Sequence, residues 1–138
     1  MRLLVFLAVL FAAPFPAQAD TVAEVSSPDG SLKVEVDVNG EGRLAYRVLR
    51  KGQPLLADSR LGFILRNDRQ FLRGLKLDRQ STRRFDETWE QPWGERRFVR
   101  NHYNELRTSF VETDRDQRRL DVVFRVFDDG IGFRYEFP

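Results

Sequence analysis

Hydrophobic and polar residues alternate along several short stretches of the chain. The clearest stretch runs from Leu32 to Val38, where apolar residues are separated by Lys, Glu and Asp. A period of two is typical of a β-strand with one buried face. Residues 25–29 lead into a turn at Gly30, and the pattern weakens over 67–84, where 71–77 is the only candidate strand. Further alternating stretches predict strands at 44–49, 61–65, 106–111, 120–127 and 131–137.

Turn signals separate these stretches. They are Asn39–Gly42, Lys51–Pro54, Thr113–Asp116 and Asp128–Gly130, and the Asp-Gly pair suits a tight hairpin turn because both residues tolerate positive φ. No window carries an apolar stripe with the helical period of 3.6. Many short strands with frequent turns argue for an antiparallel sandwich or barrel with few helices.

One stretch, Asp86–Leu106, follows neither the strand pattern nor the turn pattern. It holds both tryptophans, the only histidine and five carboxylates. A plain strand-and-turn chain does not need so many polar and aromatic groups in one place. We therefore expect this stretch to be the functional surface.

The two ends of the chain indicate how the protein is processed and where its domain stops. A charged start, an apolar run over 3–13 and the small-x-small motif at 17–19 predict a cleavable signal peptide, residues 1–19, and a periplasmic or secreted product. The apolar run is too short for a membrane anchor, which needs roughly 20 residues. The mature domain, 20–138, ends at Arg134–Pro138 inside a strand pattern, so we expect a truncated domain.

Composition excludes several classes of function. The chain has no cysteine, which excludes a lipid-anchored lipoprotein, thiolate zinc sites and cysteine nucleophiles. Removing 1–19 takes away only Arg2, so the 23 basic residues become 22 against 21 acidic residues. Basic and acidic residues are interleaved, whereas nucleic-acid-binding proteins gather basic residues on one face. No nucleic-acid partner is expected.

Carboxylates in the polar stretch suggest two kinds of chemistry. Asp86, Glu87, Glu90 and Glu95 invite comparison with a glycoside-hydrolysing pair or a calcium site, but spacing alone supplies neither the pair separation nor the 6–8 oxygen ligands. Solvated loop acids are the simpler reading. His102 and Glu105 lie three apart and would face opposite sides of an extended chain, so a metal site is not expected.

The aromatic residues of the stretch have two readings. Trp89, Trp93 and Tyr103 could form a sugar-stacking platform or an interface anchor, since these side chains combine an apolar face with a polar tip. They could equally be core residues. Pro92 and Gly94 place Trp93 in a turn-like segment, which favours a surface position.

Several motifs together resemble the N-terminal domain of glycoside hydrolase family 97. SPDGSL stands at 27–32, DETW at 86–89, WGE at 93–95, RNHYNEL at 100–106 and FRVFDDGIGFRYEFP at 124–138. The similarity covers essentially all of the chain after the leader, and the motifs follow the order found in the family.

The resemblance implies a bacterial, exported α-glucosidase or α-galactosidase that uses calcium. Such enzymes have an N-terminal β-super-sandwich of the galactose-mutarotase type, a central (β/α)8 barrel and a small C-terminal β-domain. The family's catalytic residues lie in the barrel, and the N-terminal calcium carboxylate falls beyond Pro138, so the resemblance assigns this chain no catalytic and no metal-binding residue. We expect an all-β antiparallel β-sandwich covering roughly the first half of the N-terminal domain.

The resulting hypothesis is an accessory domain that walls or rims the active site of the barrel, where an oligosaccharide binds. The residues expected to meet the barrel or the substrate are Trp89, Trp93, Glu95, Arg100, Asn101, His102, Asn104 and Glu105. Two alternatives stand beside it. One is a free-standing carbohydrate-binding module, and the other is an inert truncated sandwich or interaction domain.

Overall fold

The computed structural model describes residues 20–114 and 116–138, which form strands and no helix. The predicted all-β fold class is confirmed. The predicted leader, 1–19, lies outside the described residues. No helix with the length and hydropathy of a membrane span occurs in the described part of the chain. The strands are β1 Asp20–Ser26, β2 Leu32–Val38, β3 Leu44–Arg50, β4 Gln53–Arg60, β5 Leu75–Glu90, β6 Phe98–Glu112, β7 Arg119–Val126 and β8 Ile131–Glu136.

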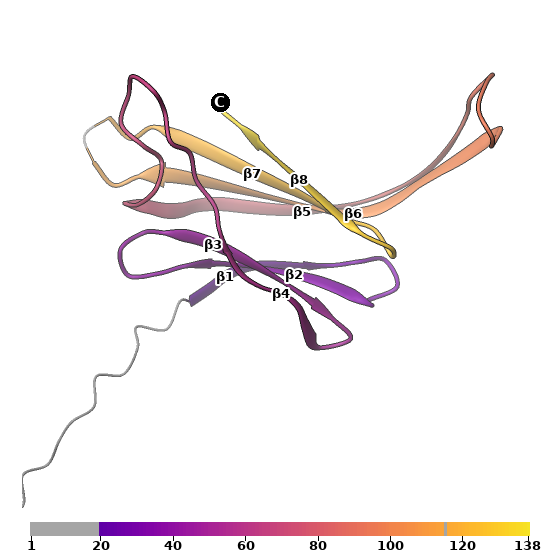
Figure 1. Ribbon diagram of the computed structural model, residues 1–138, viewed down its shortest axis with the longest axis horizontal. Coiled ribbons are helices and arrows are strands. Elements are labelled where there is room, and N and C mark those ends of the chain that lie inside the picture. The colour runs from indigo at the N-terminus through magenta and orange to yellow at the C-terminus, as the bar shows by residue number, and fades with distance from the viewer. Residues whose placement is uncertain (1–19, 115) are drawn as a thin grey trace, which may run out of the picture.

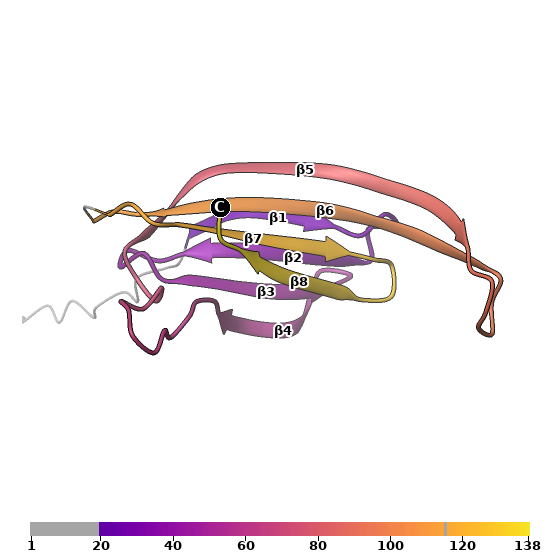
Figure 2. The same ribbon diagram turned by 90° about the horizontal axis from the view of Figure 1, so that it is seen from above.

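The strands form two antiparallel sheets that stack face to face as a β-sandwich (Figure 1). The first sheet has the order β1-β2-β3-β4 and the second has the order β5-β6-β7-β8, so each sheet is a simple meander. The loop between β4 and β5 joins the sheets and contains one isolated bridge, Phe63 to Phe71. Seen from above, the strands of the two sheets run in roughly the same direction (Figure 2), as in aligned sandwiches.

The core lies between the sheets and is built from alternating residues of both. Val34 and Val36 of β2, Leu106 and Phe110 of β6, and Phe124 of β7 are completely buried there. Full burial of one such side chain contributes about 1.5–3 kcal/mol, so this cluster holds the two sheets together. The alternation at 32–38, 106–111 and 120–126 predicts these inward positions correctly.

The second sheet is also buried on part of its outer face, away from the first sheet. Tyr103, Glu105, Asp121 and Val123 point outward and are nevertheless almost fully buried. Arginine side chains cover them, because a long apolar stem can lie on the sheet while its charged end pairs with a carboxylate. The pairs are Arg83–Glu105, Arg125–Glu105, Arg107–Asp121 and Arg107–Glu136.

Edge strands account for most of the wrong strand predictions. β4 lies at 53–60, where we predicted a turn reaching Pro54 and then a strand at 61–65, and β5 runs unbroken over 75–90 through the supposed weak region. β4, and β5 beyond Leu77, are largely exposed on both faces, so no buried face imposes an alternation on these parts of the sequence. Proline is tolerated at Pro54 because edge strands need not donate every backbone hydrogen bond.

The first strand and the polar stretch also correct the sequence analysis. β1 ends at Ser26, and the residues up to Gly30 belong to the turn, not to the strand. The stretch 86–106, expected to be neither strand nor turn, is an antiparallel hairpin made of the end of β5 and the start of β6.

Candidate functional site

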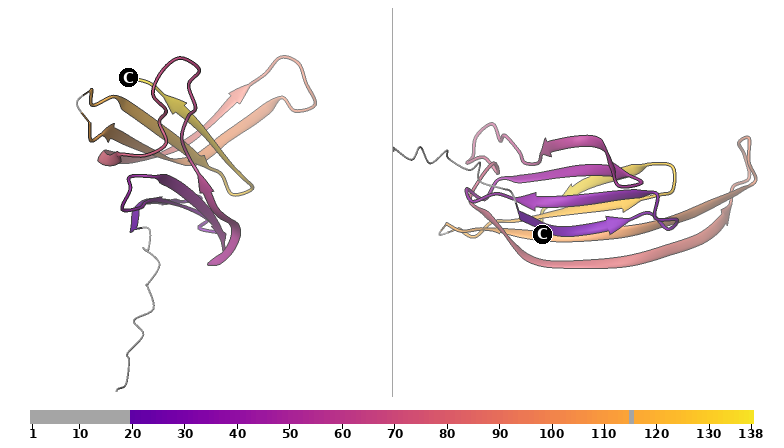
Figure 3. Two further views of the ribbon diagram at one scale, coloured as in Figure 1. Left: turned by 60° about the vertical axis from the view of Figure 1, so that its left-hand side comes forward. Right: turned by 90° about the horizontal axis from the view of Figure 1, so that it is seen from below.

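The distinctive feature of the molecule is a hairpin that projects beyond the sandwich (Figures 1 and 2). β5 and β6 pair without interruption from Arg79–Ser109 outward to Glu90–Phe98. The pairing of β6 with β7 begins only at Asn104–Val126. Residues 85–103, called the arm from here on, are therefore a two-stranded ribbon with a turn at its tip. Figure 3 shows the arm leaving the body of the sandwich from two further directions.

The tip of the arm carries exposed apolar side chains. Trp93 in the turn is 82% exposed, Phe98 is 59% exposed and Trp89 is 48% exposed. The turn is closed by the backbone N–H of Gln91, which donates to the carbonyl of Arg97 at 2.9 Å. Large apolar side chains exposed together on a soluble domain usually mark a contact surface.

Strand alternation divides the predicted site residues between the two faces of the arm. Leu106 points into the core, so Asn104, His102 and Arg100 lie on the same inner side of β6. Asn101 and Glu105 lie on the opposite, outer side, and Trp89 lies outward as well because it pairs with Val99. Trp93 and Glu95 lie in the exposed turn.

The predicted residues therefore do not form one continuous surface. Arg100, His102 and Asn104 are brought together on the inner face of β6, at and just beyond the root of the arm. Trp89 and Asn101 look the other way. Glu105 is buried among arginines: burial raises the pKa of its carboxyl, and the hydrogen bonds from Arg125 and Arg83 outweigh burial, so that the net shift is downward. Glu105 therefore acts in the ion-pair cover of the second sheet.

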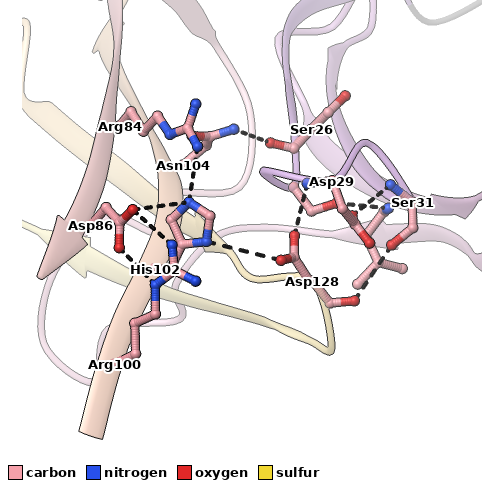
Figure 4. A network of polar contacts seen from close by, with 11 residues as sticks. Ser26, Asp29, Ser31, Arg84, Asp86, Arg100, His102, Asn104 and Asp128 are labelled. Atoms are coloured by element: carbon pink, nitrogen blue, oxygen red, sulfur yellow. Dashed lines mark hydrogen bonds and ion pairs between the residues drawn. The ribbon is translucent and has the colours of Figure 1, made fainter. Parts of the chain in front are cut away.

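The inner face holds a polar network at the root of the arm, where β7 stops pairing (Figure 4). Arg100 donates twice to Asp86, through Nε and Nη2, at 2.8 Å each, and this hydrogen bonding lowers the pKa of the Asp86 carboxyl. Nε2 of His102 lies 3.1 Å from Nη2 of Arg84 and 3.8 Å from Oδ2 of Asp86. His102 is mostly buried in this network, with 16% of its side chain exposed.

Two turns from other parts of the chain complete the network. Nδ1 of His102 lies 4.0 Å from Oδ2 of Asp128 in the β7–β8 turn. The other oxygen of Asp128, Oδ1, accepts a hydrogen bond from the backbone N–H of Asp29 in the β1–β2 turn at 2.9 Å. The side-chain amide of Asn104 donates to the carbonyl of Ser26 at 2.8 Å. Four of the motifs that carry the resemblance, separated along the chain, thus meet at one end of the sandwich.

The β1–β2 turn is itself stabilised by the Asp29 carboxylate. Its Oδ1 accepts hydrogen bonds from the Ser27 hydroxyl at 2.6 Å and from the backbone N–H of Ser31 at 2.8 Å. The Ser27 hydroxyl is the largest cause, with the Ser31 N–H next, of the fall in the pKa of this carboxyl to about 2. Asp29 is therefore an anion at any physiological pH.

Two of the four acids of the arm, Asp86 and Glu90, are engaged in ion pairs. Asp86 pairs with Arg100, and Glu90 pairs with Arg97 at 2.7 Å. Asp128 belongs to an ordinary hairpin turn, closed by the N–H of Phe127 donating to Gly130. Within 20–114 and 116–138, no three His, Asp or Glu side chains gather as a metal site would require. The acidic side chains of the arm and of the Asp128 turn do not supply the 6–8 oxygen ligands that calcium takes. We therefore assign them no metal-dependent step.

The sequence model of the glycosyl-hydrolase 97 N-terminal domain matches residues 25–138. The chain belongs to this family. It is 30% identical over 135 residues to the retaining α-galactosidase of Bacteroides thetaiotaomicron, a match that covers 98% of this chain and 19% of that enzyme.

Solved structures of related enzymes agree with the fold. A family 97 enzyme of Pseudoalteromonas sp. strain K8 in complex with acarbose superposes with a TM-score of 0.80 at 32% identity, covering 84% of this chain and 17% of that one. A β-arabinopyranosidase gives a TM-score of 0.75 at 31% identity, covering 85% of this chain and 18% of that one. The chain thus spans about a fifth of the length of these relatives.

Sequence reasoning missed part of the site in this family 97 domain. Asp29 and Asp128 were assigned only to turns, and Phe98 was not singled out. The signal was present, because both acids belong to the motifs that carry the resemblance. Their contact with each other is a property of the folded sandwich and leaves no trace in local spacing.

Proposed function

We propose that this chain is the accessory N-terminal domain of an exported α-glycoside hydrolase, in which the arm walls one side of the active site of a catalytic barrel. The family and the much greater length of its relatives supply the context. The observation that carries the proposal is the arm itself. An isolated two-stranded ribbon is marginally stable in water, and this one ends in Trp93, which is 82% exposed.

The free flank of the sandwich supports the same reading. β4 and β8 are the last strands of their sheets and lie on the same side of the molecule (Figure 2). Exposed apolar residues gather there, with Leu55 61% exposed, Phe133 42% exposed and Phe137 57% exposed. β5, the opposite edge of the second sheet, instead carries many charges, which protect an edge from pairing. A flank with this composition fits burial against further protein.

Active sites of (β/α)8 barrels open at the C-terminal face of the barrel, where appended domains can exclude water and contact substrate. In the proposed arrangement, Trp93 and Phe98 make apolar contact with the barrel or with a sugar face. Arg100 and the other polar residues of the inner face supply hydrogen bonds. The named relatives act on or bind different sugars, so we assign the substrate only as a glycoside.

The gene provides the first test. The proposal requires that the DNA on the 3′ side of codon 138 encode a (β/α)8 barrel, in frame or after a frameshift. An unrelated reading frame in that position would contradict it.

The route of export has its own test. Cleavage after Ala19 in the leader proposed from the sequence would make Asp20 the first residue of the exported product. N-terminal sequencing of that product should find Asp20, and an intact Met1 would contradict the proposal.

A free-standing carbohydrate-binding module is the second candidate, favoured by the exposure of Trp89 and Trp93. It predicts that the chain alone binds malto- or galacto-oligosaccharides in calorimetry and that Trp93→Ala removes the binding. The accessory-domain proposal predicts no measurable heat, because the arm then supplies only one wall of a pocket.

A further inference from the structure

We propose that Asp128 is a positioning residue: it ties the root of the arm to the first sheet and so fixes the direction in which the arm projects. The purpose of this tie rests on the proposed function, whereas its geometry stands on the contacts of the described residues alone. The tie, called the clamp from here on, consists of His102, Asp128 and Asp29.

The arm needs such a device because its lateral support is confined to its root, where Tyr103 also packs against Phe127 on the outer face. β7 pairs with β6 only inward from Asn104, and the arm has no third strand beyond that point. A two-stranded ribbon resists stretching well but bends and twists easily, and alone it is marginally stable. Its direction therefore depends on side-chain contacts at its root.

The first half of the clamp runs from the arm to Asp128. An arginine can only donate hydrogen bonds, so His102 accepts from Arg84 through Nε2 in the 3.1 Å contact. In the neutral ring the hydrogen then resides on Nδ1, which faces the Asp128 carboxylate at 4.0 Å. The imidazole dipole thus points its positive end at a fixed negative charge.

The second half of the clamp runs from Asp128 to the first sheet. Its Oδ1 accepts from the backbone N–H of Asp29 at 2.9 Å, and its carbonyl accepts from the Ser31 hydroxyl at 3.4 Å. The receiving turn is stiff, because the Asp29 carboxylate bridges Ser27 and the backbone of Ser31. A charge-assisted hydrogen bond to a stiff turn is a firm anchor.

A separate contact makes the attachment a two-point one. Asn104, two residues from His102 on the same face of β6, donates to the carbonyl of Ser26 at 2.8 Å. One attachment would act as a pivot, whereas two adjacent attachments define a direction. Removing the Asp128 carboxylate should therefore leave the arm attached through Asn104 but free to swing.

The same turn offers a matched control. Asp129 follows Asp128 directly, is also exposed, and lines a surface groove beside Arg50 and Leu55. Asp129→Ala removes the same charge from the same turn and leaves the contacts of the clamp in place.

The chain contains no cysteine, so spin labels can be placed cleanly at Glu95→Cys in the arm tip and Gln53→Cys in the first sheet. Double electron–electron resonance on the full chain then measures the distribution of distances between them. Asp128→Ala should widen that distribution about twofold or more, because one of the two polar attachments on the inner face is lost, while Asp129→Ala leaves it unchanged. An unchanged width for Asp128→Ala overturns the proposal, as does equal widening by both variants.

A milder substitution covers the case in which Asp128→Ala does not fold. Asp128→Asn keeps an oxygen to accept from Asp29 and removes the charge that faces His102, so it should give a smaller widening than Asp128→Ala. A width equal to that of the unsubstituted chain overturns the proposal. Because the measurement does not involve hydrolysis, failure of the clamp and failure of the proposed accessory function are separate results.

Discussion

Truncation of two aromatic residues of the same hairpin should change the stability of the fold by very different amounts. Tyr103, at the root end, is 1% exposed, stacks on Phe85 with ring centres 5.1 Å apart, and lies under the guanidinium of Arg125. Trp93, at the tip, is 82% exposed. Tyr103→Ala should therefore destabilise the fold strongly, and Trp93→Ala should leave stability almost unchanged.

The magnitudes follow from the buried area. A fully buried aromatic side chain removes about 150–250 Å² from water, which at about 25 cal/mol per Å² gives an upper bound of about 4–6 kcal/mol. Measured truncations of buried aromatics cost about 3–5 kcal/mol, so we expect about 3–4 kcal/mol for Tyr103→Ala. Trp93 buries less than a fifth of its surface, which limits its loss to about 1 kcal/mol.

Urea unfolding of the full chain, followed by far-UV circular dichroism, measures both losses. Circular dichroism is preferable to fluorescence because Trp93 is one of only two tryptophans. If Tyr103→Ala does not fold, Tyr103→Leu provides the comparison, with a loss about half as large. Equal losses for the Tyr103 and Trp93 variants would mean that Trp93 packs within the chain, and the arm would then not be a contact surface.

Three further changes test other parts of the structure. Glu105→Gln should cost about 1–3 kcal/mol in urea unfolding, because it weakens the charge-assisted hydrogen bonds that the buried Glu105 carboxylate accepts from two arginines. The exposed Glu87→Gln should cost almost nothing, and equal costs would refute the ion-pair cover of the second sheet. Gly62→Ala should lower the free energy of unfolding by about 2–4 kcal/mol, since Gly62 has φ +144° and a Cβ there would meet a backbone oxygen at 2.3 Å. The control is Gly40→Ala, whose added Cβ would meet no atom within 4 Å. A similar loss of stability at both positions would contradict the loop geometry. Because the turn lowers the pKa of the Asp29 carboxyl, the ionised carboxylate stabilises the fold fully above pH 3.8, its ordinary pKa, and this stabilisation is lost as the pH falls through about 2. An NMR titration of Asp29 should therefore have its midpoint near pH 2. A midpoint near 3.8 would show that the turn does not bind the carboxylate.

The sequence predicts the strands that have one buried and one exposed face. Residues 32–38 alternate because Val34 and Val36 enter the core while Lys33 and Glu35 face outward. In β4, and in β5 beyond Leu77, neither face is largely buried, so selection leaves no period of two there. β5 also enters the arm, where Trp89 and its neighbours serve contacts other than the core. Its sequence consequently does not look like a strand.

The candidate site could be predicted in composition but not in arrangement. The composition of 86–106 marks it as unusual, but not as a hairpin, and so it does not show that Trp89 and His102 lie on opposite faces. Once the strand is known, Leu106 fixes which residues face inward. The meeting of His102, Asp128 and Asp29 depends on the stacking of two sheets, which no local pattern encodes.

The central claim is that the arm serves a catalytic barrel, and steady-state kinetics tests it most directly. A family 97 enzyme in which this chain replaces the matching N-terminal segment should hydrolyse its aryl glycoside substrate. In that enzyme Trp93→Ala should lower kcat/KM about tenfold or more, which corresponds to the loss of about 1.4 kcal/mol of transition-state stabilisation. The melting temperature should not change. Unchanged kcat/KM in that variant, with the arm folded, would contradict the account.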